Sequence, residues 1–570
     1  MVVTGGLIMV TALWMVITGL LARSQLQAVR DEVPLLRAQI TSGDLVAARK
    51  TLDELRTHAR RAHQLTTGPA WALAAQLPGG DNPIRTVRGI AATADDLASS
   101  ALPALLDARD KIDPGSLRKA DGSIDLAPIV AVAPSIERAD RTMTAAVARV
   151  SALPPHTWLA AADHARSDLL GQLTDLAGTV RSADLAVHIA PQLLGVDGVK
   201  RYFVGFQNEA EARGTGGLPG AFAILKIDHG KPTFTRFESD TTLRKVATGL
   251  NLGADYQQLY EGAATTSLYV NSNISPNFPY AAQIWAAMWR KYSGQRLDGA
   301  IAVDPTALSY LLDVTGGATL PDGTKVDAGN VVSLTQSTVY TKFATDVAGR
   351  KKYLLDIAKA ASTRIVDSHG STSRLVDAAA KAIGERRILV WSADPSVEAQ
   401  LKQTALSGAI PPNAAPFAGL SIVNDGGNKL DYYLDRTLRW QRTGCGATRP
   451  VTVTITLTNG APTGLPAYVT ARSDEHGYSV KPGDNRLEVS YFASHEAVMQ
   501  SVTVGGKRGF VGSGDELGHP VYVVDLELPR GATRTIVFHL VEPAGSAKPV
   551  VLRQPLVRPL NVTVEDQPCG

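Results

Sequence analysis

The strongest constraint on this chain is an uncharged apolar stretch at its start, VVTGGLIMVTALWMVITGLLA (residues 2–22). A helix needs about 20 mostly apolar residues to cross a bilayer, so this stretch is long enough. Arg23 and several polar residues end it abruptly. A cleaved signal peptide would have a shorter apolar region, although Ala22 leaves cleavage open. We therefore expect residues 1–23 to form an uncleaved membrane anchor.

The charges around this stretch do not orient it. No Lys or Arg precedes residues 2–22, and Arg23 follows them, so the positive-inside rule gives no support for an outward-facing chain. Either basic residues are missing upstream or the topology is set by other features. We expect the bulk of the chain to lie outside the cytoplasm, in a single-pass membrane protein.

The two cysteines, Cys445 and Cys569, bracket the last segment of the chain. Without a CxxC or Cys/His cluster, a structural zinc site is not expected. A disulfide between them would close a loop of about 125 residues and constrain the unfolded chain by roughly 4–5 kcal/mol. Two unrelated thiols are the alternative. The expected extracytoplasmic location favours the disulfide.

Length and periodicity divide the rest of the chain. A length of 570 residues suggests three or four domains. In residues 24–65, apolar residues recur at helical steps and SGDL (42–45) marks a break with Ser42 or Asp44 as N-cap. Further helices are expected at 84–112, where Pro103 should kink or end one, and at 126–152 and 158–192. Residues 24–192 are thus predicted to form a helical stalk used for spacing or homo-oligomerisation, with a four-helix sensor domain as the alternative.

A basic cluster, RTHARRAH (residues 56–63), lies within this stalk. We expect it to form a solvent-exposed helix face. Contact with anionic lipid head groups is the alternative, which is less favoured because the cluster lies a whole helix away from the bilayer. The net charge of +3 is too small to indicate nucleic-acid binding.

The second half predicts two β-containing domains. The runs KRYFVGFQ, AFAILKID and PTFTRFE are strand-like, and strands alternate with helices up to about residue 440, which is typical of a mixed α/β domain over 193–440. Short alternating runs with turn signals then predict an immunoglobulin-like antiparallel β-sandwich over 441–570. The predicted fold class is therefore multidomain α+β: anchor, helical stalk, mixed α/β domain and β-sandwich.

The stretch QNEAEARGTGG (residues 207–217) directly follows a strand and could be a turn or an anion site. Its glycine pair would let a ligand approach the backbone, and Arg213 could bind a phosphate or carboxylate bidentately. Neither phosphate-loop fingerprint, GxGxxG or GxxxxGK[ST], is present. Glu211 and Arg213 lie two apart, so on a strand they would share one face and could simply pair.

RYFVGFQNEAEARGTGGLPGAFAIL resembles the signature of a bacterial family of membrane-anchored proteins known as a domain of unknown function (number four thousand and twelve). Its Gln-Asn-x-x-Glu-x-Arg-x-x-Gly-Gly pattern is supplied by Gln207, Asn208, Glu211, Arg213, Gly216 and Gly217. NISPNFPYAAQIW (273–285), LDGAIAVDPTALSYLLDVTG (297–316) and NDGGNKLDYYL (424–434) resemble further family segments. The resemblance implies this arrangement of stalk, core and sandwich and says little about activity.

The order of parts is also similar to that of the LytR-CpsA-Psr phosphotransferases. DGAIAVDPTALSYLLDVTGGATL resembles their strand–helix–Gly-Gly segment, and DVAGRKKYLLDIAKA (346–360) resembles their basic pyrophosphate-binding segment. The chain departs from them where VYTKFATD replaces an Arg-x-Arg and where SDTTLR (239–244) only approximates an Asp-Thr pair. The resemblance implies transfer of a polyprenyl-pyrophosphate-linked glycan to the cell wall, with Mg²⁺ as the possible metal.

This resemblance and the chemistry of a pyrophosphate, which needs several cations and a metal held by acids, give the candidate site residues. The candidate catalytic residues are Arg213, Asp240 and Arg350, the candidate substrate-binding residues are Asn208, Glu211, Gly216, Gly217, Arg244, Lys342 and Lys351, and the candidate metal ligands are Asp240 and Asp304. Each could instead belong to an ion pair or a helix end. Asp304 before Pro305 favours an N-cap, and the run at 350–352 favours a solvated helix face.

Two functions follow. The first is envelope glycan assembly by transfer of a polyprenyl-linked glycan, and the second is a non-catalytic scaffold that binds glycan or protein. The expected partners are the membrane, a polyprenyl-linked glycan or wall polymer, and further copies of the chain, with no nucleic acid. Convergence of Arg213, Arg244 and Arg350 with an acid on one cleft would favour the enzyme, and separate placement would favour the scaffold.

Overall fold

The computed structural model describes residues 2–77, 81–112, 117–368, 370–474, 477–545 and 547–569. The chain divides into two compact units. The first comprises Met1–Lys119 and Ile124–Gln192, and the second comprises Ala120–Ser123 and Leu193–Gly570. The molecule is a multidomain α+β protein, with a helical first unit and several β-sheets in the second.

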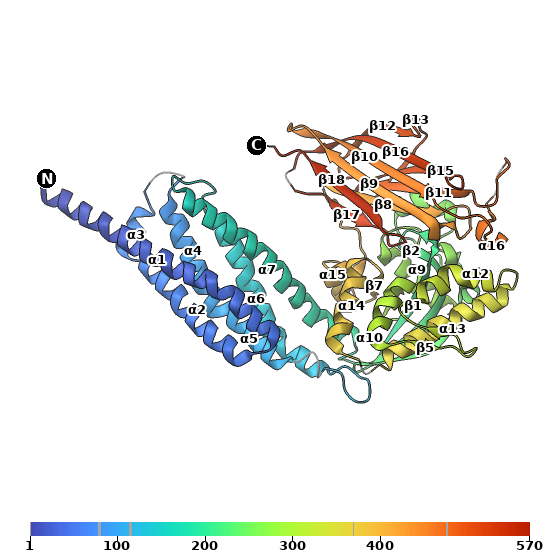
Figure 1. Ribbon diagram of the computed structural model, residues 1–570, viewed down its shortest axis with the longest axis horizontal. Helices are drawn as coiled ribbons and strands as arrows, with labels where there is room; N and C mark the ends of the chain where they lie inside the picture. The colour runs from blue at the N-terminus through green and yellow to red at the C-terminus, as the bar shows by residue number, and fades with distance from the viewer. Residues whose placement is uncertain are drawn as a thin grey trace. The chain divides into compact units, whose positions relative to one another are not determined.

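The first unit is a set of long helices (Figure 1). They are α1 (Val2–Ser42), α2 (Leu45–Thr66), α3 (Pro69–Ala74), α4 (Pro83–Asp96), a π-helical turn (Leu97–Ala101), α5 (Leu102–Lys111), α6 (Leu126–Ser151) and α7 (Ala160–Leu193). The break between α1 and α2 is where the sequence predicts it, and Asp44 is the N-cap because its carboxylate accepts from the backbone N–H of Ala47. Pro103 lies in the first turn of α5, directly after the π-helical turn.

Small and branched residues form the core of this unit. Leu36 of α1 and Leu52 and Leu55 of α2 belong to one buried cluster. Met143 of α6 and Leu173 of α7 belong to another, which also holds several alanines. Alanine adds little bulk at a helix contact, so the Ala-rich composition of this region suits closely packed helices.

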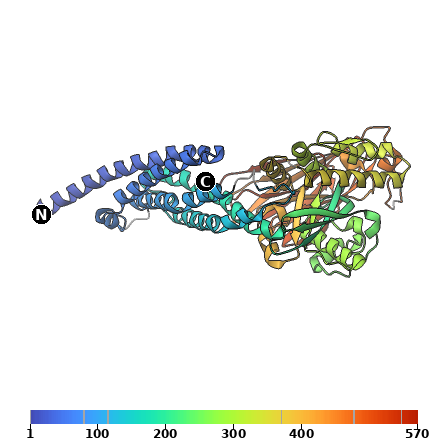
Figure 2. The ribbon, with the colours of Figure 1, turned by 90° about the horizontal axis from the view of Figure 1, so that it is seen from below.

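Helix α1 continues well beyond the predicted anchor. Its segment Met9–Ile40 is long and apolar enough to cross a membrane, which is consistent with a single membrane pass. The start of α1 extends past the other helices of this unit (Figure 2). The anchor and the first stalk helix are thus one continuous element rather than two.

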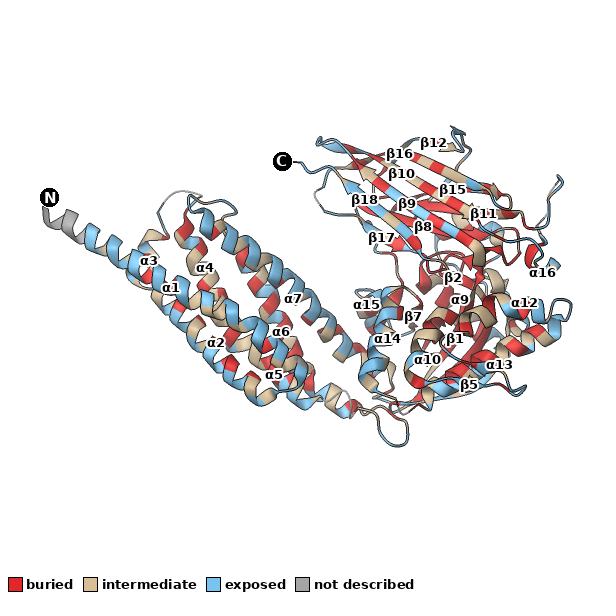
Figure 3. Ribbon diagram, in the orientation of Figure 1, coloured by how far each residue is buried: buried red, intermediate tan, exposed pale blue. Residues whose placement is uncertain are grey.

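The second unit begins with a mixed sheet in the order β3-β2-β1-β4-β7. Its strands are β1 (Lys200–Arg213), β2 (Gly216–Asp228), β3 (Lys231–Ser239), β4 (Gly299–Val303) and β7 (Ile388–Ser392). β1 pairs antiparallel with β2 and parallel with β4, and β7 pairs antiparallel with β4. Figure 3 shows β1 and β2 buried along most of their length.

Helices cover both faces of this sheet. Alternate residues of β1 point to opposite faces, so Tyr202 belongs to one core cluster and Phe203 to another. The first cluster includes residues of α10 (Pro305–Thr315) and α13 (Val347–Val366), and the second includes residues of α8 (Ala254–Tyr260) and α9 (Phe278–Ser293). The remaining elements of this region are β5 (Ala318–Thr319), β6 (Lys325–Val326), α11 (Val331–Ser333), α12 (Val339–Lys342), α14 (Thr372–Gly384) and α15 (Pro395–Leu401).

Two further sheets follow, in the orders β13-β12-β16-β10-β9-β18 and β14-β15-β11-β8-β17. Their strands are β8 (Phe417–Asn424), β9 (Leu434–Arg442), β10 (Thr448–Asn459), β11 (Asn485–Phe492), β12 (Val498–Val504), β13 (Lys507–Arg508), β14 (Gly512–Glu516), β15 (His519–Leu528), β16 (Thr533–Pro543), β17 (Val550–Arg553) and β18 (Leu560–Asp566). A short helix, α16 (Ala467–Thr470), lies in a connection.

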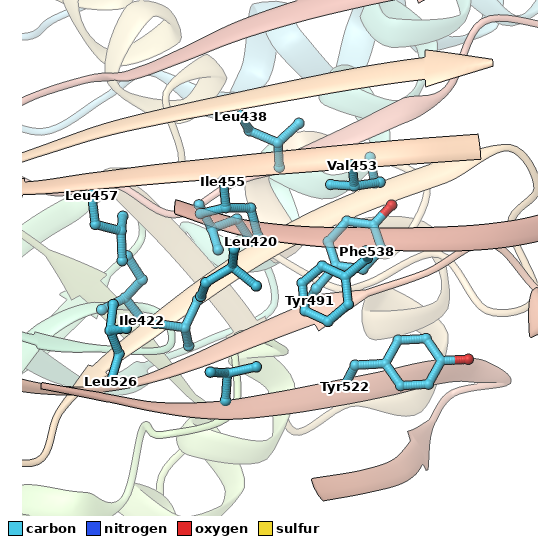
Figure 4. Packing of buried hydrophobic residues seen from close by; sticks show 14 of the residues in the cluster. Leu420, Ile422, Leu438, Val453, Ile455, Leu457, Tyr491, Tyr522, Leu526 and Phe538 are labelled. Atoms are coloured by element: carbon cyan, nitrogen blue, oxygen red, sulfur yellow. The ribbon is translucent and has the colours of Figure 1, made fainter. Parts of the chain in front are cut away.

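These two sheets share one core. Leu438 and Phe538 of the first sheet and Leu420 and Tyr491 of the second belong to the same buried cluster (Figure 4). The structure differs from the sequence expectation in two ways. β8 and β9, expected in the α/β domain, pair into these sheets. The edge strands β17 and β18 pair in parallel, so the sheets are not purely antiparallel.

The predicted disulfide is confirmed. Cys445 and Cys569 are bonded, with their Cα atoms 5.5 Å apart. Cys445 follows β9 and Cys569 follows β18, and these two strands are neighbours in one sheet. The disulfide therefore fastens the end of the chain beside the strand that it pairs with.

Candidate functional site

The glycines of the signature shape the hairpin between β1 and β2. Arg213 pairs with Gly216, so the hairpin loop has two residues. Gly216 has φ of 139°, in the region that favours glycine. A Cβ on Gly217 would lie 2.1 Å from the backbone carbon of Asn208. Of the two interpretations of this stretch, a turn or a ligand site, the glycine pair supports the turn, because it allows close contact between the protein's own strands.

Arg213 is held in a buried ion pair at the end of β1. Its Nη2 lies 2.9 Å from Oε1 of Glu211, and Lys429 donates to the other oxygen of that carboxylate. The guanidinium also donates to backbone carbonyls, including that of Asn424 in β8. Burial lowers the pKa of Lys429 to about 8. The signature acid and arginine therefore join β1 to β8 and to the turn that carries Lys429.

A second buried cluster surrounds Arg387. Its Nη1 lies 2.8 Å from Glu209 and 3.0 Å from Asp304, and its Nη2 donates to the carbonyl of Leu556. Burial, and then the nearby Asp304 carboxylate, raise the pKa of Glu209 well above its usual range. Gln336 donates to the same glutamate. This cluster places the ends of β1 and β4 against the chain segment that precedes β18.

Asp304 is therefore not placed as a metal ligand. Its carboxylate accepts from the backbone N–H of Ala307, 2.7 Å away, and so caps α10, as the competing interpretation of Asp-Pro predicted. Its other oxygen binds Arg387. In the part of the chain that the structure describes, no group of three His, Cys, Asp or Glu side chains is placed to hold a metal.

Residues from the C-terminal part of the chain form hydrogen bonds with the same hairpin. Asp431 accepts from the backbone N–H of Ala212 at 2.7 Å and from the side chains of Asn424 and Asn485. Gln554 donates to the carbonyls of Arg213 and Ile422, both at 2.6 Å. We call the buried set formed by Glu209, Glu211, Arg213, Asp304, Arg387, Lys429, Asp431 and Gln554 the junction cluster. Sequence reasoning missed Glu209, Arg387, Asp431 and Gln554, whose partners lie far away in the chain.

Arg350 lies in a different environment, among aromatic rings. Its guanidinium carbon is 3.4 Å from the ring centre of Tyr468 and 5.9 Å from that of Tyr340. One guanidinium nitrogen donates to the carbonyl of Phe343, and Nη2 has no hydrogen-bond partner among the described residues. Arg350 is 2% exposed, whereas Tyr468 is 40% exposed. The predicted solvated helix face is therefore wrong for Arg350.

Lys342 extends this group. Its Nζ lies 4.2 Å from the ring centre of Tyr353 and 2.9 Å from Asp322. We call Arg350, Lys342, Tyr340, Tyr353 and Tyr468 the cation–aromatic patch. Asn208 also reaches it, because its amide donates to the hydroxyl of Tyr340 at 2.8 Å.

The other predicted residues are members of neither the junction cluster nor the cation–aromatic patch. Asp240 pairs with Lys351 at 2.6 Å, so a candidate metal ligand already holds a cation. Arg244 is exposed and has no ion pair within the described residues. Arg213, Arg244 and Arg350 thus have separate sets of partners. Arg350 contacts Tyr468, whereas Arg213 pairs with Glu211, which also pairs with Lys429.

Together, the fold and these clusters define a multidomain protein with one candidate membrane helix and a second unit in which a mixed sheet and two further sheets meet at a buried junction cluster. Residues 197–340 match the family described as "Protein of unknown function (DUF4012)", which supports the family predicted from the signature. No curated protein matches the chain. The similarity to LytR-CpsA-Psr phosphotransferases stays a prediction.

Proposed function

We propose that this chain is a membrane-anchored, extracytoplasmic protein of the cell envelope that binds an anionic glycan polymer without transferring it. The observation that supports binding over transfer is the separate placement of Arg213, Arg244 and Arg350. A pyrophosphate in a transfer reaction needs several cations and a metal gathered around it. Arg213 is instead used inside the protein, in the junction cluster.

Two features support the location. Helix α1 contains a segment long and apolar enough for one membrane pass. The disulfide between Cys445 and Cys569 suits an oxidising compartment, since such bonds are rare in the reducing cytoplasm. Both agree with a second unit that lies outside the membrane.

The cation–aromatic patch is the proposed binding surface. Lys342, whose side chain is 40% exposed, supplies positive charge for a carboxylate or phosphate group of a polymer, and Arg350 lies buried against the ring of Tyr468. Tyr468 adds an exposed ring with an apolar face and a polar hydroxyl. An anionic glycan carries both kinds of complementary group, charges and apolar ring faces.

Transfer of a polyprenyl-pyrophosphate-linked glycan, with Mg²⁺, is the second candidate. One observation favours it: Lys351 follows Arg350 on α13 and holds Asp240 close by. To bind Mg²⁺, Asp240 would have to give up its ion pair with Lys351. Asp304 could not join it as a ligand without leaving Arg387 and the α10 N-cap.

The test compares binding and transfer by the full-length protein in detergent. We expect wild type to co-sediment with anionic wall glycan, and the double variant Lys342→Ala/Tyr468→Ala to lose this binding at least tenfold. Lys352→Ala is the matched control, because Lys352 lies exposed on α13 with Asp356 as its partner. Unchanged binding by the double variant would contradict the patch. Metal-dependent release of the polyprenyl carrier would favour transfer instead, and unchanged wall polymers in a deletion strain would contradict both functions.

A further inference from the structure

Helix α2 returns to the apolar end of α1. The two helices pack along each other (Figure 1), and α3 follows at the end of α2. The indole N–H of Trp71 in α3 donates to the hydroxyl of Thr18 in α1 at 2.9 Å. Thr18 lies about one turn before Arg23, where the apolar stretch ends. Trp71 therefore lies where tryptophan is enriched in membrane proteins, at the edge of the apolar layer.

This arrangement changes the expectation for the basic cluster RTHARRAH. From the sequence alone, residues 56–63 are expected to lie a whole helix away from the bilayer. Because α2 folds back on α1, the end of this cluster lies beside the end of the apolar stretch, where Arg61 lines the same cavity as Leu21 and Gln25 of α1. The cluster is close enough to meet lipid head groups.

A cavity of about 510 Å³ lies between α1 and the α2–α3 turn. Its apolar lining comes from Trp14, Met15 and Leu21 of α1, and from Leu65 and Trp71 opposite. The volume is in the range of small-molecule sites. An apolar chain can therefore lie in it without leaving the hydrocarbon layer.

The lining changes character along α1. Gln25, Arg61 and Gln64 line the other end of the cavity. Trp14 and Gln25 are about 16 Å apart along the helix, so the cavity runs from apolar to polar across the membrane boundary. Arg61 is exposed and has no ion pair within the described residues, and it is the one charged side chain in the lining.

Other residues at this end of the unit are also apolar and exposed. Leu73 and Leu77, which belong to α3 and the turn after it, are 69% and 59% exposed. Trp158, between α6 and α7, is 70% exposed, and its backbone N–H donates to the carbonyl of Asp81 near the start of α4. Apolar side chains of this size suit a membrane surface better than water.

We propose that this cavity binds one anionic phospholipid, with its chain beside Trp14, Leu21 and Trp71 and its phosphate on Arg61. The single cation matches a head group with one net negative charge. A diphosphate would require several cations, which the lining does not offer. The cavity contains no acid to hold the ammonium group of a zwitterionic lipid. This inference rests on the proposed membrane anchor, and it would fix the first unit at the membrane surface.

Native mass spectrometry of the full-length protein tests the proposal. The protein is titrated in mild detergent with phosphatidylglycerol, phosphatidylcholine or polyprenyl diphosphate. We expect wild type to retain one phosphatidylglycerol in preference to phosphatidylcholine. Arg61→Ala should weaken this binding about tenfold, since a charge-assisted hydrogen bond is lost. Ala70→Trp, which fills the cavity, should lower it as well.

Arg60→Ala is the matched control, because Arg60 is the exposed neighbour of Arg61 and does not line the cavity. It should bind phosphatidylglycerol within twofold of wild type. Equal binding by Arg61→Ala and wild type, or equal retention of phosphatidylcholine, would overturn the proposal. So would displacement by a lower concentration of polyprenyl diphosphate. Alkaline carbonate extraction tests the membrane anchor separately from the lipid site. Release of the protein from membranes would contradict the anchor. Retention of the protein, together with unchanged phosphatidylglycerol binding by Arg61→Ala, would contradict the lipid site alone.

Discussion

At the scale of single residues, the protein uses its most distinctive side chains internally. Glu211 and Arg213 of the signature form an ion pair. Their spacing on one strand predicts this pair as the alternative to a ligand site. That local pairing could be predicted from sequence. Glu209 could not be matched with Arg387, or Arg213 with Gln554, because these partners are 178 and 341 residues apart and nothing local marks them.

Replacing Arg387 should destabilise the second unit strongly. In Arg387→Ala, Glu209 and Asp304 lose the cation that they share while both stay buried. Breaking a buried ion pair from one side typically costs about 3–5 kcal/mol. Urea denaturation followed by tryptophan fluorescence measures this. Arg244→Ala is the control, since Arg244 is exposed and its loss should cost less than about 0.5 kcal/mol. Equal midpoints for the two variants would contradict the role given to Arg387.

Glu516 should make stability depend on pH. Its carboxylate is buried and accepts from Tyr260 at 2.5 Å and Ser275 at 2.7 Å. Burial raises its pKa from 4.5 to about 7. The folded protein therefore keeps a proton that the unfolded chain releases, so the free energy of unfolding falls as the pH rises from about 4.5 to about 7.

Melting temperatures measured across that pH window test this prediction. Glu516→Gln removes the titrating group and should melt with a weaker pH dependence than wild type. A slope remains, because burial also raises the pKa of Glu488 and Glu542 to about 7. Glu496→Gln, at an exposed site, should match wild type. The assignment would be contradicted if the melting temperature of wild type rose between pH 4.5 and 7 while that of Glu516→Gln did not.

At the scale of elements, the sequence predicts the features that depend on a few neighbouring residues, such as strands and helix caps. Strand-like apolar runs gave β1 and β2, and Asp44 and Asp304 were recognisable N-caps because the cap is made within a few residues. The two sheets that β8 and β9 join were not predictable in this way. β9 pairs with β10 and β8 pairs with β11, and the residue pattern of a strand does not indicate which strands it pairs with.

The hairpin between β1 and β2 gives a prediction at this scale. Gly217→Ala should destabilise the protein by roughly 1–3 kcal/mol, because its Cβ would overlap the backbone of Asn208. Gly220→Ala is a matched control in the same strand, since its Cβ would lie 3.9 Å from Leu218. Thermal melting distinguishes the two. A Gly217→Ala variant as stable as Gly220→Ala would show that the glycine is not needed for strand contact.

At the scale of the whole molecule, the second unit joins three sheets through one buried cluster and closes its last strand with a disulfide. The long apolar helix at the start of the chain and the order of helical and β-rich parts were predictable, because composition and period differ between segments. The junction was not, since it arises only when residues from β1, β4, β8 and the segment before β18 meet. Because Arg213 is already paired inside the junction cluster, we assign the proposed binding role to the cation–aromatic patch instead.

The disulfide should stabilise the C-terminal sheets. Cys445→Ser/Cys569→Ser removes the constraint on a long loop of the unfolded chain, worth roughly 4–5 kcal/mol in the chain-entropy model. We expect the melting temperature of the oxidised wild type to exceed that of the double variant, and reduction to bring wild type down to the same value. If reduction left the wild-type melting temperature unchanged, the bond would not contribute to stability.

The most direct test of the central claim is the stability and glycan binding of Arg213→Gln, measured on the same preparation. If Arg213 holds the junction cluster together, the melting temperature falls by several degrees, because Glu211 loses its arginine while buried. Below that temperature, the folded variant binds anionic glycan as wild type does. An unchanged melting temperature together with lost binding or lost glycan transfer would contradict the claim and place Arg213 in a ligand site.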